Sequence, residues 1–183
     1  MFTEKRIVVA GNGEVKLPVG FRFRPTDEEL VVRYLKPKFH SLPLPASVIP
    51  EADDVFNTDP WDLSGDPREK RYFFSRRRWD ANRCRGTTTG CGHWKAVGKE
   101  KYIMSKQQQA VLGIRKTLVF RHGHGRQPRE STTQWVMHEY RLLLGSETTV
   151  NSSSSQKSGG EREEWVVCGT YQRRMKPRKN KGG

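Results

Sequence analysis

A short lysine-rich run, HWKAVGKEK, carries the side chains best suited to bind another molecule. In an extended strand successive side chains point to opposite faces, so one face receives Trp94, Ala96 and Gly98. The opposite face receives Lys95, Val97, Lys99 and Lys101. Trp94 would fix the strand in a core, while three ammonium groups surround one small apolar side chain. Such a strand fits a DNA major groove, with lysines on phosphates or guanine edges and Val97 against a thymine methyl.

The same pattern also fits an ordinary edge strand, on which solvated lysines discourage aggregation. Arginine-rich segments on both sides favour the nucleic-acid interpretation. The first holds Arg76, Arg77, Arg78, Arg83 and Arg85, and the second holds Arg126 and Arg129. Arginines on loops suit phosphate binding, which positions a protein without selecting a sequence. Between Lys101 and Arg129 there is no acidic residue, so the positive charge is not balanced locally.

The charge of the whole chain is concentrated around this run. Residues 71–129 hold fifteen Lys and Arg against two acids, a net charge of +13 out of +14 for all 183 residues. A folded protein with such self-repulsion is most simply explained by a polyanionic partner. Tyr, Phe and Trp residues interleave with the charges, and they supply enough apolar mass for the region to fold.

Cysteine and histidine spacing favours neither a metal site nor catalysis. Cys84 and Cys91 are separated by six residues, and no second close pair follows, whereas zinc sites use two close pairs. A Cys–His nucleophilic pair is conceivable, but no orienting group or oxyanion loop is recognisable. His138 fits a hydrogen-bonded histidine of a sheet. We therefore expect no enzyme activity, no metal, no cofactor and no small-molecule substrate.

The bulk features predict one intracellular domain. Three cysteines are a sparse, odd set that suits a reducing compartment. No apolar run is long enough to cross a bilayer, and the first residues lack a signal-peptide pattern, so no membrane partner is expected. The expected organisation is a flexible arm over 1–16, a folded domain over 17–172 with a Ser-rich loop at 145–163, and a basic tail over 173–183.

Local signals predict an α+β fold in which helices flank a twisted antiparallel sheet. Thr26 and Glu29 form a capping-box pattern before an apolar run, and Pro37 should end or bend this helix near Lys36. Residues 42–70 are rich in Pro, Asp and Gly, which predicts loops with one short helical turn at 46–49. About six strands should follow: 71–75, 93–97, 101–104, 116–122, 134–142 and 164–171.

Seven motifs follow one another from about Leu17 to Tyr171: LPVGFRFRPTDEELVVRYL, DPWDL, REKRYFFS, TGCGHWKAVGKE, LGIRKTLVF, QWVMHEYRL and EWVVC. In this order they resemble the NAC domain of plant transcription factors. The resemblance implies a nuclear, sequence-specific DNA-binding transcription factor without enzyme activity. It also implies homodimers or heterodimers with other NAC-type proteins, and a strand inserted into the major groove of double-stranded DNA with a CGT or CACG core.

The resemblance also implies residue roles. A dimer-forming ion pair falls on Arg22 and Glu29, and the rest of the interface falls on Leu17, Pro18, Gly20 and Phe21. This role competes with the capping box for the Glu29 carboxylate, which has the capacity for both. With the charge pattern, the expected DNA-binding residues are Lys95, Ala96, Val97, Gly98, Lys99, Lys101, Arg83, Arg85, Arg76, Arg126, Arg129 and Lys116. The tail residues Arg173, Arg174, Lys176, Arg178 and Lys179 suit nuclear import or are merely solvated.

Several positions depart from the family pattern. Thr87 and Thr132 stand where basic residues are usual, and Val97 replaces a threonine. His93 replaces an aromatic residue, and Gly169 and Thr170 interrupt the usual ending. Family members normally continue into a regulatory region, so the chain is expected to be either truncated or a short member. The alternative function is therefore a NAC-like dimerisation module with weak DNA binding that sequesters full-length relatives.

Overall fold

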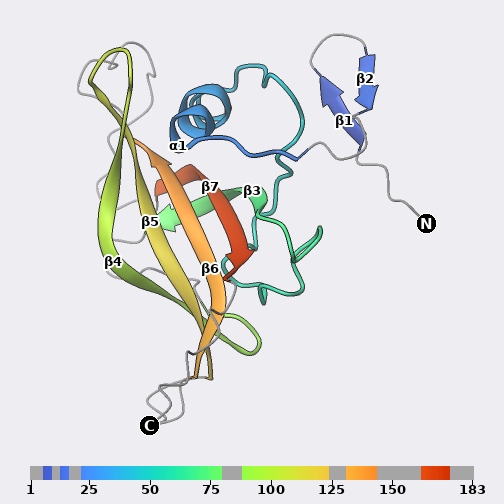
Figure 1. Cartoon of the computed structure of the whole chain (residues 1–183), viewed down its shortest axis with the longest axis vertical. Helices are drawn as coiled ribbons and strands as arrows, with labels where there is room; N and C mark the ends of the chain where they lie inside the picture. The colour runs from blue at the N-terminus through green and yellow to red at the C-terminus, as the bar shows by residue number, and fades with distance from the viewer. Residues whose placement is uncertain are drawn as a thin grey trace, which may run out of the picture.

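A twisted five-stranded antiparallel sheet forms the body of the protein (Figure 1). The computed structural model describes residues 6–9, 13–16, 22–79, 88–123, 131–143 and 162–173. The strands are β3 (Arg71–Trp79), β4 (Gly92–Met104), β5 (Val111–His122), β6 (Ser131–Leu142) and β7 (Arg162–Gln172). Their order is β3-β7-β6-β5-β4, so β4 to β7 form a meander and β3 joins its far edge beside β7. The predicted antiparallel α+β fold is confirmed.

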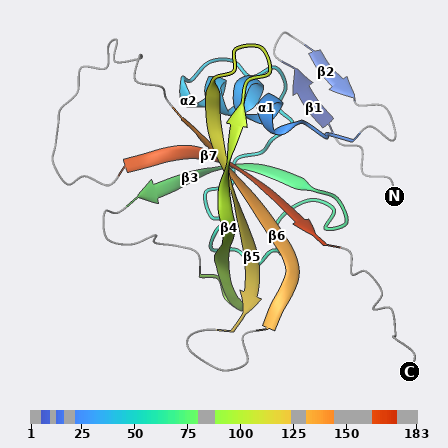
Figure 2. The ribbon, with the colours of Figure 1, turned by 60° about the vertical axis from the view of Figure 1, so that its left-hand side comes forward.

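One continuous helix packs at an end of the sheet (Figure 2). It consists of α1 (Asp27–Glu29), the π-helical turn η1 (Leu30–Leu35) and α2 (Lys36–Phe39). The predicted capping box is confirmed: Thr26 N donates to Glu29 Oε2 at 2.9 Å, and Glu29 N donates to Thr26 Oγ1 at 3.2 Å. Together the two bonds satisfy two backbone donors that the first turn would leave unpaired.

Pro37 does not end the helix near Lys36, because the helix continues to Phe39. Proline lacks an N–H and its ring presses on the carbonyl four residues earlier, so a regular α-helix would kink here. The preceding turn is instead widened: Lys36 N donates to the Val31 carbonyl, five residues back. We attribute the accommodation of Pro37 to this wider turn.

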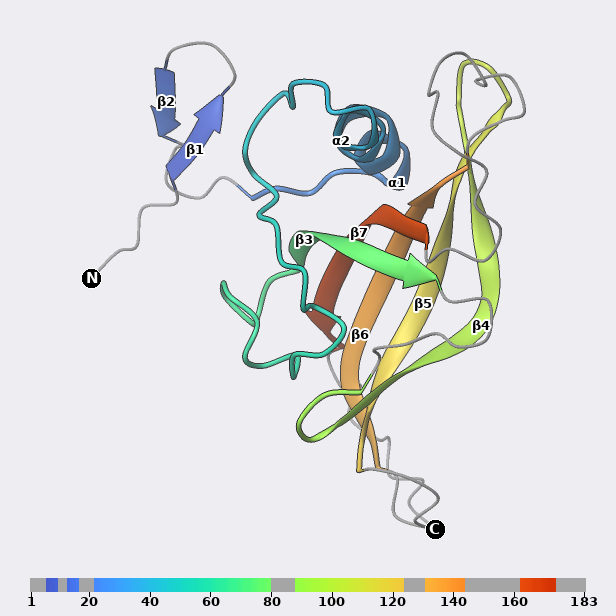
Figure 3. The ribbon, with the colours of Figure 1, turned by 180° about the vertical axis from the view of Figure 1, so that it is seen from behind.

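The sheet has a core on each face. The core between the helix and the sheet contains Leu30, Val31 and Leu35 of the helix together with Tyr72, Phe74, Ile103, Tyr140 and Val167 of the sheet. The opposite core contains Val55, Phe56, Leu63, Phe73, Trp94, Phe120, Met137 and Cys168. The second core is covered by the connection between α2 and β3, which runs down beside the sheet in Figure 3. Arg71 fixes this connection by donating to the carbonyls of Leu63 at 2.5 Å and Pro60 at 2.6 Å.

Some elements differ from the prediction. The strands expected at 93–97 and 101–104 are one strand, β4, with a register shift between Val97 and Lys101. The expected turn at 46–49 contains bends and no helix. Part of the expected arm is paired, since β1 (Arg6–Val9) and β2 (Gly13–Lys16) form a separate antiparallel pair. None of the helices in the described ranges has the length and apolarity needed to span a bilayer.

Candidate nucleic-acid interface

The lysine-rich run lies on β4, which is an edge strand of the sheet (Figure 1). β5 pairs with one side of β4, and no other strand of the described parts pairs with the outer side. An edge strand can enter a groove without loss of ladder hydrogen bonds, since its outer backbone groups are unpaired. The position of β4 therefore leaves this run open to a partner.

The register of β4 against β5 establishes which side chains share a face. Trp94 pairs with Phe120, and Lys95 pairs with Val119 on the opposite face. Trp94 is 2% exposed, and its ring centroid lies 5.2 Å from that of Phe120 in an edge-to-face contact. The prediction that Trp94 fixes the strand in the core is therefore confirmed. Lys95 is exposed and Val97 is half-buried.

A bulge interrupts the strand at its middle. Val97 pairs with Thr117 and Lys101 pairs with Arg115, so three residues of β4 lie opposite one residue of β5. Gly98 has φ +71°, a left-handed conformation that glycine adopts without steric cost. Lys99 lies in the bulge, and it is exposed together with Lys101. The bulge thus presents Lys99 and the bare Gly98 backbone to solvent, and the exposed Lys101 follows directly after it.

The structure brings together part of the predicted DNA-binding set. Lys95, Ala96, Val97, Gly98, Lys99 and Lys101 lie side by side on β4. Lys116 is half-buried on β5 and pairs across the sheet with Glu139, on the face opposite Lys95. Arg76 lies on β3, the other edge strand, with its guanidinium 4.9 Å from the Trp165 ring centroid. Arg83, Arg85, Arg126 and Arg129 lie outside the described residues.

The predicted dimer and tail residues are described only in part. Arg22 is exposed, and its Nε lies 3.2 Å from Glu69 Oε1. Glu29 holds the capping box, and the hydrogen bonds from Thr26 are the main cause that lowers the pKa of its carboxyl group. Arg173 is exposed. Outside the described residues lie Leu17, Pro18, Gly20, Phe21, Arg174, Lys176, Arg178 and Lys179.

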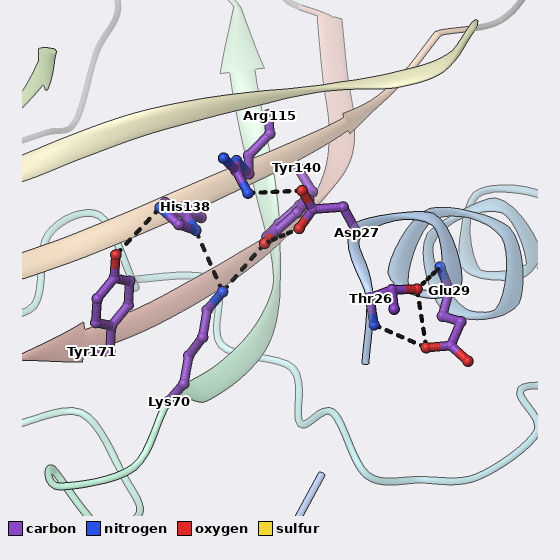
Figure 4. Close-up of polar contacts among 8 residues, drawn as sticks. All are labelled: Thr26, Asp27, Glu29, Lys70, Arg115, His138, Tyr140 and Tyr171. Atoms are coloured by element: carbon purple, nitrogen blue, oxygen red, sulfur yellow. Dashed lines mark hydrogen bonds and ion pairs between the residues drawn. The ribbon is translucent and has the colours of Figure 1, made fainter. Parts of the chain in front are cut away.

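A polar cluster connects the helix to the sheet (Figure 4). Asp27 accepts hydrogen bonds from Arg115 Nη1 at 2.7 Å and from Tyr140 Oη at 2.9 Å. Burial lowers the pKa of Lys70 to about 8. The pKa of His138 is about 4, first because of burial and then because of the positive charge of Lys70. His138 lies within hydrogen-bonding distance of Lys70 and Tyr171, which confirms it as a hydrogen-bonded sheet histidine.

Sequence reasoning missed this cluster because its residues are far apart along the chain. It also missed Tyr102, which is 61% exposed on β4 near the lysines. The signal was the position of Tyr102 directly after Lys101 on the same predicted strand. An exposed aromatic ring beside cationic side chains offers a flat surface for stacking as well as charge.

The described ranges contain no group of three or more Cys, His, Asp or Glu side chains arranged to hold a metal ion. Cys91 interacts with Asp59, and the hydrogen bond to Asp59 is the main cause that raises the pKa of its thiol. Cys168 is fully buried, and burial raises the pKa of its thiol well above the ordinary value.

Comparison with known proteins places the chain in a family. The profile of the no apical meristem (NAM) protein family matches residues 18–142. NAC domain-containing protein 83 of Arabidopsis thaliana is 46% identical over 171 residues, which cover 92% of this chain and 63% of the relative. NAC domain-containing protein 41 of the same plant is 45% identical over 97% of the chain and 61% of the relative. NAC transcription factor NAM-1 of Hordeum vulgare subsp. vulgare is 40% identical over 88% of the chain and 43% of the relative.

The chain therefore spans less than two thirds of the length of these relatives. The matched segment contains the capping box, the polar cluster up to Tyr140 and the whole of β4. By this match, the chain belongs to the no apical meristem, or NAC-domain, protein family.

Proposed function

We propose that the protein is a nuclear NAC-type transcription factor that inserts β4 into the major groove of double-stranded DNA. The observation that carries this proposal is the arrangement of β4: a buried Trp94 on one face and exposed lysines along an open edge. The names of the relatives, which include transcription factors, support the same function. The expected sites have a CGT or CACG core.

Four residues of β4 have separate roles in this proposal. Lys95 and Lys99 bind phosphates or guanine edges, since a lysine ammonium is a hydrogen-bond donor to both. Val97 contacts a thymine methyl, because it is the small apolar side chain between the lysines. Gly98 has no heavy atom within 4 Å of the position a Cβ would take, so the open space allows close approach of the DNA backbone.

Arg83, Arg85, Arg126, Arg129 and Lys101 are proposed as additional phosphate-binding residues. In this proposal Lys116 and Arg76 contribute only to the long-range attraction of DNA. Lys116 lies on the sheet face opposite Lys95, and Arg76 lies on β3 at the other edge of the sheet. Long-range attraction of this kind depends on net charge rather than on contact.

The test is a double substitution, Lys95→Ala with Lys99→Ala, and its matched control is Lys36→Ala with Lys106→Ala. All four lysines are exposed, so both variants remove two charges from the surface. Binding to a CGT-core duplex and to random DNA is measured by fluorescence anisotropy over a range of salt concentrations. The β4 variant should lose specific binding, and the slope of log affinity against log salt should fall by about two. Equal effects of the two variants would overturn the β4 interface.

We further propose that the chain dimerises through its N-terminal segment, with Arg22 of one copy paired to Glu29 of the other. Arg22 is exposed, and its pair with Glu69 is a surface pair of the kind worth less than about 1 kcal/mol, so it exchanges partners at small cost. Arg22→Ala should raise the dimer dissociation constant in sedimentation, while Arg68→Ala serves as a control on an exposed arginine nearby. A dimer unaffected by Arg22→Ala would remove this role.

The same experiments address the alternative function, a dimerisation module that sequesters full-length relatives. A wild-type chain that forms dimers but binds CGT-core DNA no better than random DNA would favour it.

A further inference from the structure

Lys70 directs its amine into an enclosure of polar and aromatic side chains (Figure 4). Its Nζ lies 3.3 Å from Tyr140 Oη and 3.4 Å from His138 Nδ1. The ring centroids of Tyr72, Tyr171 and Tyr140 lie 5.1, 5.6 and 5.7 Å from Nζ. Within the described ranges, the structure gives this amine no ion pair with a carboxylate. Its direct partners are therefore neutral groups and ring faces.

Gly169 on β7 provides the space for the lysine stem. A Cβ at this position would lie 2.8 Å from Lys70 Cε and 3.1 Å from Tyr72 Cε1, both closer than ordinary contact distance. Any residue with a side chain would therefore displace Lys70 from the enclosure. The enclosure therefore depends on a glycine at this position of β7.

The enclosure accommodates both protonation states of the amine. The ammonium form donates to Tyr140 Oη and to His138 Nδ1, while His138 Nε2–H donates to the Tyr171 hydroxyl. When the amine is neutral, the other histidine tautomer allows Nδ1–H to donate to Nζ, and the Tyr171 hydroxyl donates to Nε2. After loss of the lysine proton, Nζ and both ring nitrogens of His138 thus keep a hydrogen-bond partner.

Burial shifts the balance between these states. It lowers the pKa of Lys70 to about 8, so roughly a quarter of the amine is neutral at pH 7.5, against about 0.1% for a solvent-exposed lysine. The neutral amine is the nucleophilic form of lysine. Lys70 consequently holds far more of the nucleophilic form near neutral pH than a lysine in free solution does.

A cleft of about 390 Å³ gives access to this region of the surface. Lys70 and Tyr72 line it together with Arg22, Arg24 and Arg68, and one acidic residue, Glu69, lies among them. The excess of guanidinium groups favours reagents that carry negative charge. The cleft therefore suits an anionic molecule, which would lie against Lys70 in its wall.

We propose that Lys70 is an acylation site, at which the neutral amine accepts acyl groups from anionic thioester donors. The hydrogen bond from His138 Nδ1–H to Nζ first breaks, which frees the Nζ lone pair. The lone pair then attacks the thioester carbonyl carbon, the new C–N bond forms, and the C–S bond breaks. The thiolate leaves and takes up the proton that the nitrogen loses, directly or through His138. The product is a neutral amide, so the positive charge beside Asp27 is removed.

The test follows the reaction of the whole chain with acetyl-coenzyme A, with site-resolved mass spectrometry between pH 6.5 and 10.5. The rate of acetylation at Lys70 should reach half its maximum near pH 8. The rate for a short unstructured peptide that contains one lysine, followed in the same reaction, should keep rising to about pH 10. Failure to acetylate Lys70 at any pH, or a profile equal to that of the peptide, would overturn the proposal.

Two variants separate the enclosure from mere exposure. Gly169→Ala displaces the flexible end of Lys70 and should move its midpoint up by about two pH units, whereas an unchanged midpoint would contradict the enclosure. Circular dichroism establishes that this variant is folded.

Arg24→Ala should slow acetylation by the anionic donor several-fold and leave the rate with a neutral thioester unchanged. Equal slowing with both donors would show that the cleft does not select charge.

Discussion

Acidification should destabilise the protein through His138. The imidazole is held neutral between Lys70 and Tyr171, and its pKa is about 4 in the folded chain against an ordinary value of 6.5. As pH falls below 6.5, the unfolded chain binds this proton before the folded chain does. The contribution of the neutral histidine to the free energy of unfolding is therefore present above pH 6.5 and is lost as pH falls toward 4. The full loss is about 3 kcal/mol, of which about 2 kcal/mol has occurred by pH 5.

The assay is urea unfolding at pH 7.5 and at pH 5.0, followed by tryptophan fluorescence. His138→Asn keeps a polar group near the position of Nδ1 but cannot take up a proton. The wild-type chain should lose about 2 kcal/mol more stability between the two pH values than the variant loses. The carboxylates titrate in both proteins, so the difference isolates the histidine. Equal losses would refute the burial of a neutral imidazole at this position.

Three further substitutions test other parts of the fold. Trp94→Ala should lower the free energy of unfolding by about 3–5 kcal/mol in urea titrations, because it empties a site that is 2% exposed; a loss below 1 kcal/mol would show that the core does not depend on it. Thr26→Ala should cost about 1 kcal/mol by removing the cap, and Thr26→Ser should restore most of it. Gly98→Ala should cost about 1 kcal/mol, because an alanine at φ +71° is strained even where space is open. In anisotropy titrations it should also weaken DNA binding, and unchanged stability would indicate that the bulge readjusts freely.

The features that the sequence predicts correctly are those set by neighbouring residues. Thr26 and Glu29 are three residues apart, so their capping box depends only on the local backbone. The alternation that buries Trp94 and exposes Lys95 is likewise a property of one strand. The antiparallel sheet follows from successive strands with short connections.

The features that the sequence leaves open depend on distant partners. The bulge at Gly98 exists because Val97 and Lys101 pair with β5 residues that are only two apart, and no pattern within β4 specifies this. The cluster of Asp27, Lys70 and His138 combines the helix, a connection and β6. The continuation of the helix past Pro37 depends on a widened turn rather than on propensity.

The position of β7 has a consequence for biosynthesis. Although β7 is the last described strand, it lies between β3 and β6, and Arg71 pairs with Thr170. During translation, β3 emerges long before its partner and must remain without it until residue 172 has left the ribosome. A polypeptide interrupted before Arg162 would leave both β3 and β6 with unsatisfied backbone groups. Chaperones and proteases should therefore engage the nascent chain until its final strand is available.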